Sequence, residues 1–146
     1  MRKTLIAIAI ALAIVASIIY IASLPAATIA ITQDELDQAY DANGGVITRQ
    51  IEVSSGDKFR VNLYAHWSSG MKWSVSYDRP GIVRQDGARE LVYDSLPLFG
   101  SPSHEEWIFK ALAEGEAAII LTYGSVANLP DAPRSVNTLI IKVKVK

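Results

Sequence analysis

The residue types that most often perform chemistry are sparse in this chain. Two histidines, His66 and His104, and no cysteine occur among its 146 residues. The histidines lack the spacing of metal ligands, and the sequence has neither a Gly-x-Ser-x-Gly nucleophile elbow nor a glycine-rich phosphate loop. Neighbouring strand residues point to opposite faces, so Glu105 and Glu106 cannot share one substrate atom as an acid pair. We predict that the protein is not an enzyme, holds no metal, needs no cofactor, and carries these two glutamates as solvated charges.

Three segments have instead the composition of recognition loops: 66–72, 98–105 and 124–135. Each contains glycine or proline, which restrict the shapes that a loop can adopt. Such loops on a rigid scaffold are typical of binding proteins.

One tryptophan lies within the first of these segments and another directly follows it. Trp67 lies at its predicted tip, where an indole stays exposed unless it contacts a partner. The alternative is that it packs back onto Tyr64 or Pro102. Trp73 follows the segment and is predicted to face a core. The intervening Ser68-Ser69 pair supplies either partner contacts or turn formers.

A hydrophobic alternation of period two recurs after residue 45, as half-buried strands require. It predicts strands over 46–53, 58–65, 72–77, 106–111, 117–123 and 138–146, with one or two more inside 82–98. This pattern favours an all-β, immunoglobulin-like antiparallel β-sandwich, with a β-barrel as the structural alternative. In that sandwich the three segments occupy the B–C, D–E and F–G positions at one end. The predicted core consists of Phe59, Leu63, Trp73, Trp107, Phe109, Leu121 and Tyr123.

The N-terminal region, residues 1–30, is predicted to be a signal peptide or a transmembrane signal-anchor. Arg2 and Lys3 precede the uncharged stretch 5–24, and twenty helical residues can cross a hydrocarbon core of ~30 Å. Thr28 and Ala30 have the small side chains of a cleavage site. The basic start predicts an extracytoplasmic location for the rest of the chain, anchored through residues 5–24 if the segment is retained.

Residues 31–45 are either a tether or a short helix, because Thr32-Gln33-Asp34-Glu35 has the form of a capping box and Asn43-Gly44-Gly45 that of a linker. The predicted domain then comprises residues 46–146. The formal net charge of −1 argues against nucleic acid as a partner.

The stretch from Val46 to Val145 resembles the chagasin-like family of cysteine peptidase inhibitors. Its framework carries the resemblance at these positions: Gly56-Asp57-Lys58-Phe59-Arg60-Val61-Asn62-Leu63, Gly70, Trp73, Trp107, Gly115, Leu121-Thr122-Tyr123 and the closing alternation.

The resemblance implies an immunoglobulin-like inhibitor of papain-like cysteine peptidases that inserts three loops into the active-site cleft. The residues that it assigns to this contact are His66, Trp67, Ser68, Ser69 and Gly70, then Gly100, Ser101, Pro102 and Ser103, then Gly124, Ser125, Val126 and Ala127.

These loops depart from the family's motifs. His66-Trp67 replaces Asn-Pro, the second loop keeps one glycine of three, and the third lacks the Arg-Pro-Trp motif. The alternative functions are therefore a non-inhibitory cell-surface immunoglobulin-like binding or structural module and, more remotely, a hydrolase whose triad is assembled from distant residues.

Overall fold

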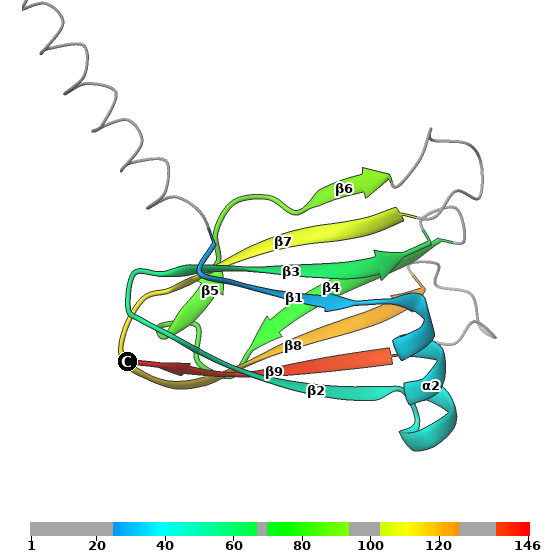
Figure 1. The fold of residues 1–146 in the computed structure, drawn as a ribbon, viewed down its shortest axis with the longest axis horizontal. Coiled ribbons are helices and arrows are strands. Elements are labelled where there is room, and N and C mark those ends of the chain that lie inside the picture. Colours follow the sequence, from blue (N-terminus) through cyan, green and yellow to red (C-terminus); the bar gives the residue numbers. More distant parts are fainter. Residues whose placement is uncertain (1–24, 67–69, 94–102, 126–136) are drawn as a thin grey trace, which may run out of the picture.

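The computed structural model describes residues 25–66, 70–93, 103–125 and 137–146, which fold as two β-sheets packed face to face (Figure 1). A five-stranded sheet has the order β1-β3-β7-β5, with β6 also paired to β7. A four-stranded sheet has the order β2-β9-β8-β4. This arrangement confirms the predicted sandwich and excludes the closed barrel. The elements are β1 (Ala27–Ile31), α2 (Gln33–Asn43), β2 (Val46–Val53), β3 (Lys58–Ala65), β4 (Met71–Tyr77), β5 (Val83–Gln85), β6 (Glu90–Tyr93), β7 (Ser103–Ala111), β8 (Gly115–Ser125) and β9 (Asn137–Val145).

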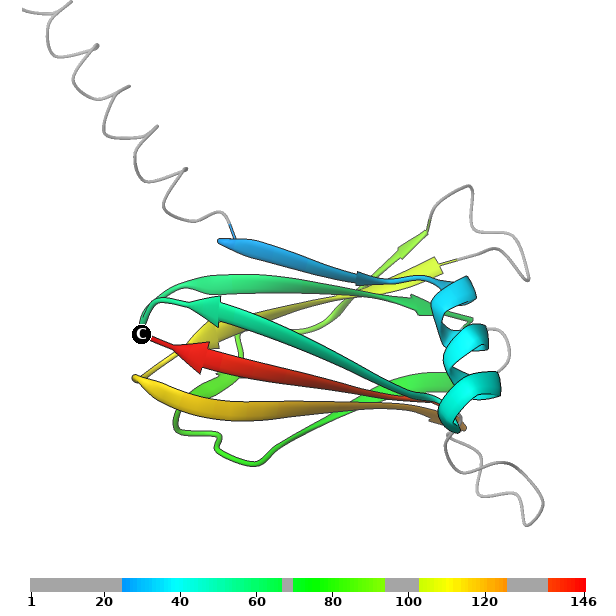
Figure 2. The ribbon, with the colours of Figure 1, turned by 60° about the horizontal axis from the view of Figure 1, so that its bottom comes forward.

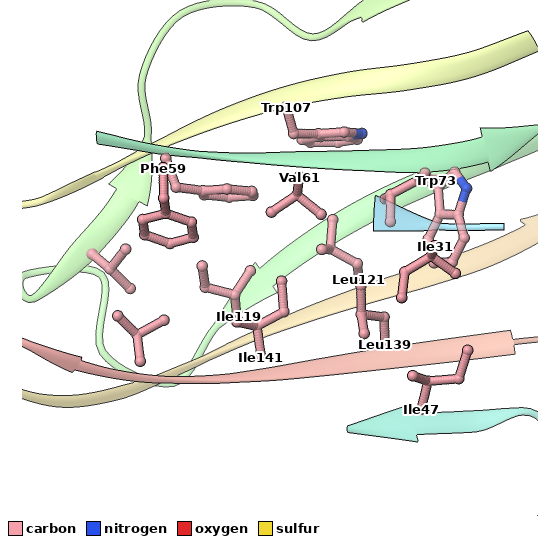
Figure 3. Packing of buried hydrophobic residues seen from close by; sticks show 14 of the residues in the cluster. Ile31, Ile47, Phe59, Val61, Trp73, Trp107, Ile119, Leu121, Leu139 and Ile141 are labelled. Carbon is pink, nitrogen blue, oxygen red and sulfur yellow. The ribbon is translucent and has the colours of Figure 1, made fainter. Parts of the chain in front are cut away.

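The core lies between the sheets and follows from the period-two alternation. Strands β3, β7, β8 and β9 bury alternate side chains, and those of Phe59, Leu121 and Ile141 point into the space between the sheets (Figure 3). The rings of Phe59 and Phe109 stack with centroids 5.6 Å apart. All seven side chains predicted for the core are buried.

Two strand pairs are parallel, which corrects the prediction of an antiparallel sandwich. Strand β1 runs parallel to β3, and β2 runs parallel to β9. Helix α2 connects the end of β1 in one sheet to the start of β2 in the other. The chain therefore runs beside β3 towards the helix and returns beside β9 (Figures 1 and 2).

The sandwich begins well before residue 46, where the sequence pattern predicts its start. Ile31 at the end of β1 and Leu36 in α2 are both buried in the common core. Within the range 31–45, for which the sequence allows a tether or a short helix, residues Gln33–Asn43 form helix α2. The predicted capping box is present, since Glu35 N donates to Thr32 Oγ1 at 3.3 Å and Thr32 N donates to Glu35 Oε2 at 3.0 Å. The helix ends at Gly44, whose positive φ of 69° suits glycine.

The predicted hydrophobic helix over residues 5–24 lies outside the described residues. Among the residues that the structure does describe, no helix has both the length and the apolar character needed to cross a membrane.

We expect β1 to contribute measurably to stability, although it lies within the predicted leader. A chain that begins at residue 31 loses four of its five residues and exposes the outer edge of β3. Compared with a chain that begins at residue 25, its free energy of unfolding in urea should fall by about 2–4 kcal/mol, from lost apolar burial and backbone pairing. Equal urea midpoints would show that β1 is dispensable.

Candidate functional site

One end of the sandwich gathers the chain ends that flank all three predicted loops; we call it the loop pole. Ala65, the last residue of β3, pairs with Ser103, the first residue of β7. Met71, the first residue of β4, pairs with Ser125, the last residue of β8. The C-terminal residue Lys146 lies at the other end, the opposite pole (Figure 1). Segments that are distant in sequence therefore leave a common rigid base.

The first loop is held at its incoming end by β8. The His66 N–H donates to the Tyr123 hydroxyl at 2.9 Å, a bond that joins the two sheets. Tyr123 is itself stacked on Trp73, with ring centroids 5.0 Å apart. The Trp73 indole N–H donates to Tyr64 O at 2.9 Å, so the same tryptophan of β4 also holds the C-terminal end of β3.

The outgoing end of the first loop needs glycine. Gly70 has a positive φ of 74°, a conformation that side-chain-bearing residues rarely adopt. A Cβ at this position would meet nothing within 4 Å, so the requirement comes from the backbone and not from crowding. This is the glycine that the family resemblance singles out.

Two side chains of β7 point inward behind the loops. Ser103 is buried, and its hydroxyl donates to Ala65 O at 2.7 Å. The carboxylate of Glu105 is fully buried; it accepts from Arg89 Nη1 at 3.3 Å and, at the longer distance of 3.5 Å, from Trp73 N. The prediction of a solvated Glu105 is therefore wrong, because Arg89 supplies a charge partner that desolvation requires. Glu106 points to the other face and remains partly exposed.

Helix α2 lies at the same pole and braces the base of the third loop. Asn137, the first residue of β9, is buried and donates from Nδ2 to Leu36 O at 3.0 Å. Thr138 N donates to Gly45 O at 2.7 Å. The ion pair between Glu35 and Arg49 ties the helix to β2. The sequence pattern does not indicate this role, because Asn137 is 101 residues from its partner.

The predicted contact residues fall into three groups. His66 and Gly70 border the first loop. Ser103, Gly124 and Ser125 lie in strands β7 and β8, and Ser103 is buried, so its described role is to support the loop base. The remaining ones lie outside the described residues: Trp67, Ser68, Ser69, Gly100, Ser101, Pro102, Val126 and Ala127.

The described part of the loop pole offers shape and backbone rigidity more than reactive groups. Within residues 25–66, 70–93, 103–125 and 137–146, no three His, Asp or Glu side chains converge as metal ligands would. Hydrogen bonds from Lys58 and Lys146 lower the pKa values of Asp86 and Glu52, but both pairs lie towards the opposite pole.

A surface hollow of about 580 Å³ also lies away from the loop pole. It is on the outer face of the four-stranded sheet, where Glu52 and Glu116 alternate with Lys142 and Lys144. Such alternation is typical of a solvated, ion-paired sheet face. We therefore place the candidate site at the loop pole.

Solved structures share this fold at low sequence identity. The cysteine protease inhibitor EhICP2 from Entamoeba histolytica matches with a TM-score of 0.56 and 20% identity, over 82% of this chain and 96% of the inhibitor. Amebosin matches with a TM-score of 0.51 and 22% identity, over 84% of this chain and 100% of Amebosin. PbICP-C, solved in complex with falcipain-2, matches with a TM-score of 0.50 and 18% identity, over 82% of this chain and 98% of PbICP-C. No curated protein sequence matches the chain.

The sequence itself identifies the family. Residues 52–141 match the sequence model described as Chagasin family peptidase inhibitor I42. This range is more than half of the chain and includes both ends of each of the three loops, so it confirms the resemblance drawn from the framework residues. It also confirms that the protein is not an enzyme. The chain belongs to the chagasin family of peptidase inhibitors.

Proposed function

We propose that the protein inhibits papain-like cysteine peptidases by inserting its loop pole into the active-site cleft. The observation that carries this proposal is the meeting of three pairs of loop ends at one end of a rigid sandwich. A convex edge of this kind can fill a groove, whereas a flat sheet face cannot. The structural likeness to PbICP-C, solved with falcipain-2, supports the same kind of partner.

Rigid anchoring of the loop bases supports binding without covalent chemistry. The hydrogen bonds of His66 N to the Tyr123 hydroxyl and of the Ser103 hydroxyl to Ala65 O hold the N–H and the C=O of one peptide unit, the unit at which the first loop begins. A loop held in its bound direction loses less conformational entropy on association. Inhibition by occupancy then needs no nucleophile, metal or cofactor from this chain.

We also propose that residues 5–24 are retained as a membrane anchor and that the sandwich lies outside the cytoplasm. Cleavage after Ala30 would remove four of the five residues of β1, a paired strand of the sandwich. Ala26 N already donates to Lys58 O at 2.6 Å, at the opposite pole. An anchor that joins β1 there leaves the loop pole directed away from the bilayer.

Trp67 is expected to be the main aromatic anchor in the cleft. Trp67→Ala should weaken inhibition of papain by the full chain about 30-fold, because buried interface tryptophans commonly cost ≥ ~2 kcal/mol when truncated. Ser101→Ala, which removes only a small hydroxyl from the second predicted loop, is the control and should change the inhibition constant little. Thermal stability must stay unchanged in both variants. An unchanged inhibition constant for Trp67→Ala would refute the wedge, and a parent chain that binds no papain-like peptidase would favour the surface-module alternative.

A pair of tyrosines separates loop support from general stability. Tyr123 accepts from His66 N at the loop pole, and Tyr77 accepts from Gln85 N at 3.0 Å between β4 and β5. Tyr123→Phe and Tyr77→Phe should each lower the free energy of unfolding by about 0.5–1.5 kcal/mol, since each leaves one amide without its acceptor. Only Tyr123→Phe should weaken papain inhibition. Equal inhibition by the two variants would mean that this bond does not support the loop.

The anchor can be tested by liposome flotation at alkaline pH. The full chain should float with the lipid, because residues 5–24 are long enough to span the hydrocarbon core. A chain that begins at residue 25 should remain in the soluble fraction while keeping its fold. Recovery of exported protein with residue 31 at its N-terminus would contradict a retained anchor.

A further inference from the structure

Residues 86–89 interrupt one edge of the five-stranded sheet. Strand β5 pairs with residues 109–111 of β7, and β6 pairs with residues 103–106. Between them the chain turns at Gly87, whose φ is 89°, and then reaches Arg89. The Arg89 guanidinium carbon lies 5.5 Å from the centroid of the Trp107 ring. Because the chain leaves the edge of the sheet between β5 and β6, the charged side chain of Arg89 can lie against Trp107.

The Arg89 side chain reaches from this edge to the other sheet. Its Nη1 donates to Trp73 O at 2.6 Å and to Glu105 Oε2 at 3.3 Å. The other oxygen of Glu105 lies 3.5 Å from Trp73 N. The backbone C=O of Trp73 is therefore contacted by the side chain of Arg89, and its N–H by the side chain of Glu105. Because β4 is the edge strand of the four-stranded sheet, these side chains occupy a place that a further strand would otherwise take.

A role in stability alone does not explain this choice of residues. Glu105 is fully buried, and burying a carboxylate costs free energy that its partners must offset. A well-packed apolar side chain often serves stability equally well or better. What the ion pair adds is direction, since it holds the backbone N–H and C=O of one residue of β4, Trp73, at a defined distance from β7.

Trp73, the residue that it holds, lies shortly after the first loop. Trp73 follows Gly70 by three residues, and Ser103, which binds Ala65 O, precedes Glu105 by two. We propose that Arg89 and Glu105 are positioning residues for the first inhibitory loop: by holding Trp73 they fix the two described residues that border this loop, His66 and Gly70. The positioning role does not depend on the proposed inhibitory function. Only its expected effect on peptidase binding rests on that function.

The contacts themselves decide which substitutions are informative. The donations of Arg89 to Trp73 O and to Glu105 come from one nitrogen, so Arg89→Lys can restore these two, whereas Arg89→Met cannot. Arg60 provides a matched control, because its Nε lies 3.3 Å from Glu106 Oε1, on the same two-sheet scaffold but with both side chains more exposed. Arg60→Met removes an arginine–glutamate pair of similar length without touching Trp73.

The direct test is amide hydrogen exchange by NMR on the full chain in detergent micelles. In Arg89→Met, the amides of His66 and Trp73 should exchange at least about tenfold faster relative to those of Ile119 and Ile141 in the central strands β8 and β9. Arg89→Lys should remain within about threefold of the parent, and Arg60→Met should leave the ratio unchanged. Acceleration that is uniform over all four amides would reduce the pair to global stability and overturn the proposal.

Inhibition of papain tests the consequence. Arg89→Met should raise the inhibition constant about tenfold or more, with Arg89→Lys within about threefold of the parent and Arg60→Met unchanged. Loosened His66 and Trp73 amides without any loss of inhibition would overturn the link between positioning and binding. If the parent chain itself does not inhibit papain, the proposed function fails, while the exchange measurement still decides whether the pair positions the loop.

Discussion

A buried carboxylate ties the two sheets together at the point where the first loop leaves them. Glu105 belongs to one sheet, and it meets Arg89 and the backbone of Trp73, which belongs to the other. A buried carboxylate needs a charged partner close by, because desolvation of an unpaired charge costs free energy. Among the contacts that the structure describes, Arg89 supplies this charge from its place beside Trp107, and Trp73 supplies a backbone N–H. The geometry of the loop pole depends on these contacts.

The rest of the pole is built outward from Trp73. Its ring stacks on Tyr123, its indole N–H binds Tyr64 O, and Tyr123 in turn binds His66 N. Helix α2 braces the other side through Asn137. These contacts join the ends of loops that are far apart in sequence, so the loops leave a single preorganised base. The proposed binding depends on preorganisation in particular, because the loop sequences depart from the family's motifs and would supply fewer of the usual anchors.

Much of the framework could be predicted from the sequence, because it depends on local periodicity. Alternation across residues 58–65 and 117–123 located the strands and placed Phe59 and Leu121 in the core. The capping box located the start of α2. Strand β1 was not predictable in this way, since its small apolar residues continue the composition of residues 5–24. The burial of Glu105 was missed because an acidic residue in a strand is ordinarily solvated. Its partner lies 16 residues away in a segment without strand periodicity, and only the tertiary fold brings the two together.

The central claim is that the loop pole occupies the catalytic cleft of a papain-like peptidase. It is tested most directly by comparing binding of the full chain to papain with an open cleft and to papain whose cleft is filled by an irreversible peptide-like inhibitor. We predict reversible 1:1 binding to the open enzyme and a loss of affinity of at least about 100-fold for the filled one, because the two occupants exclude each other. Equal binding to both forms, or binding to neither, by a chain that is folded would contradict the account.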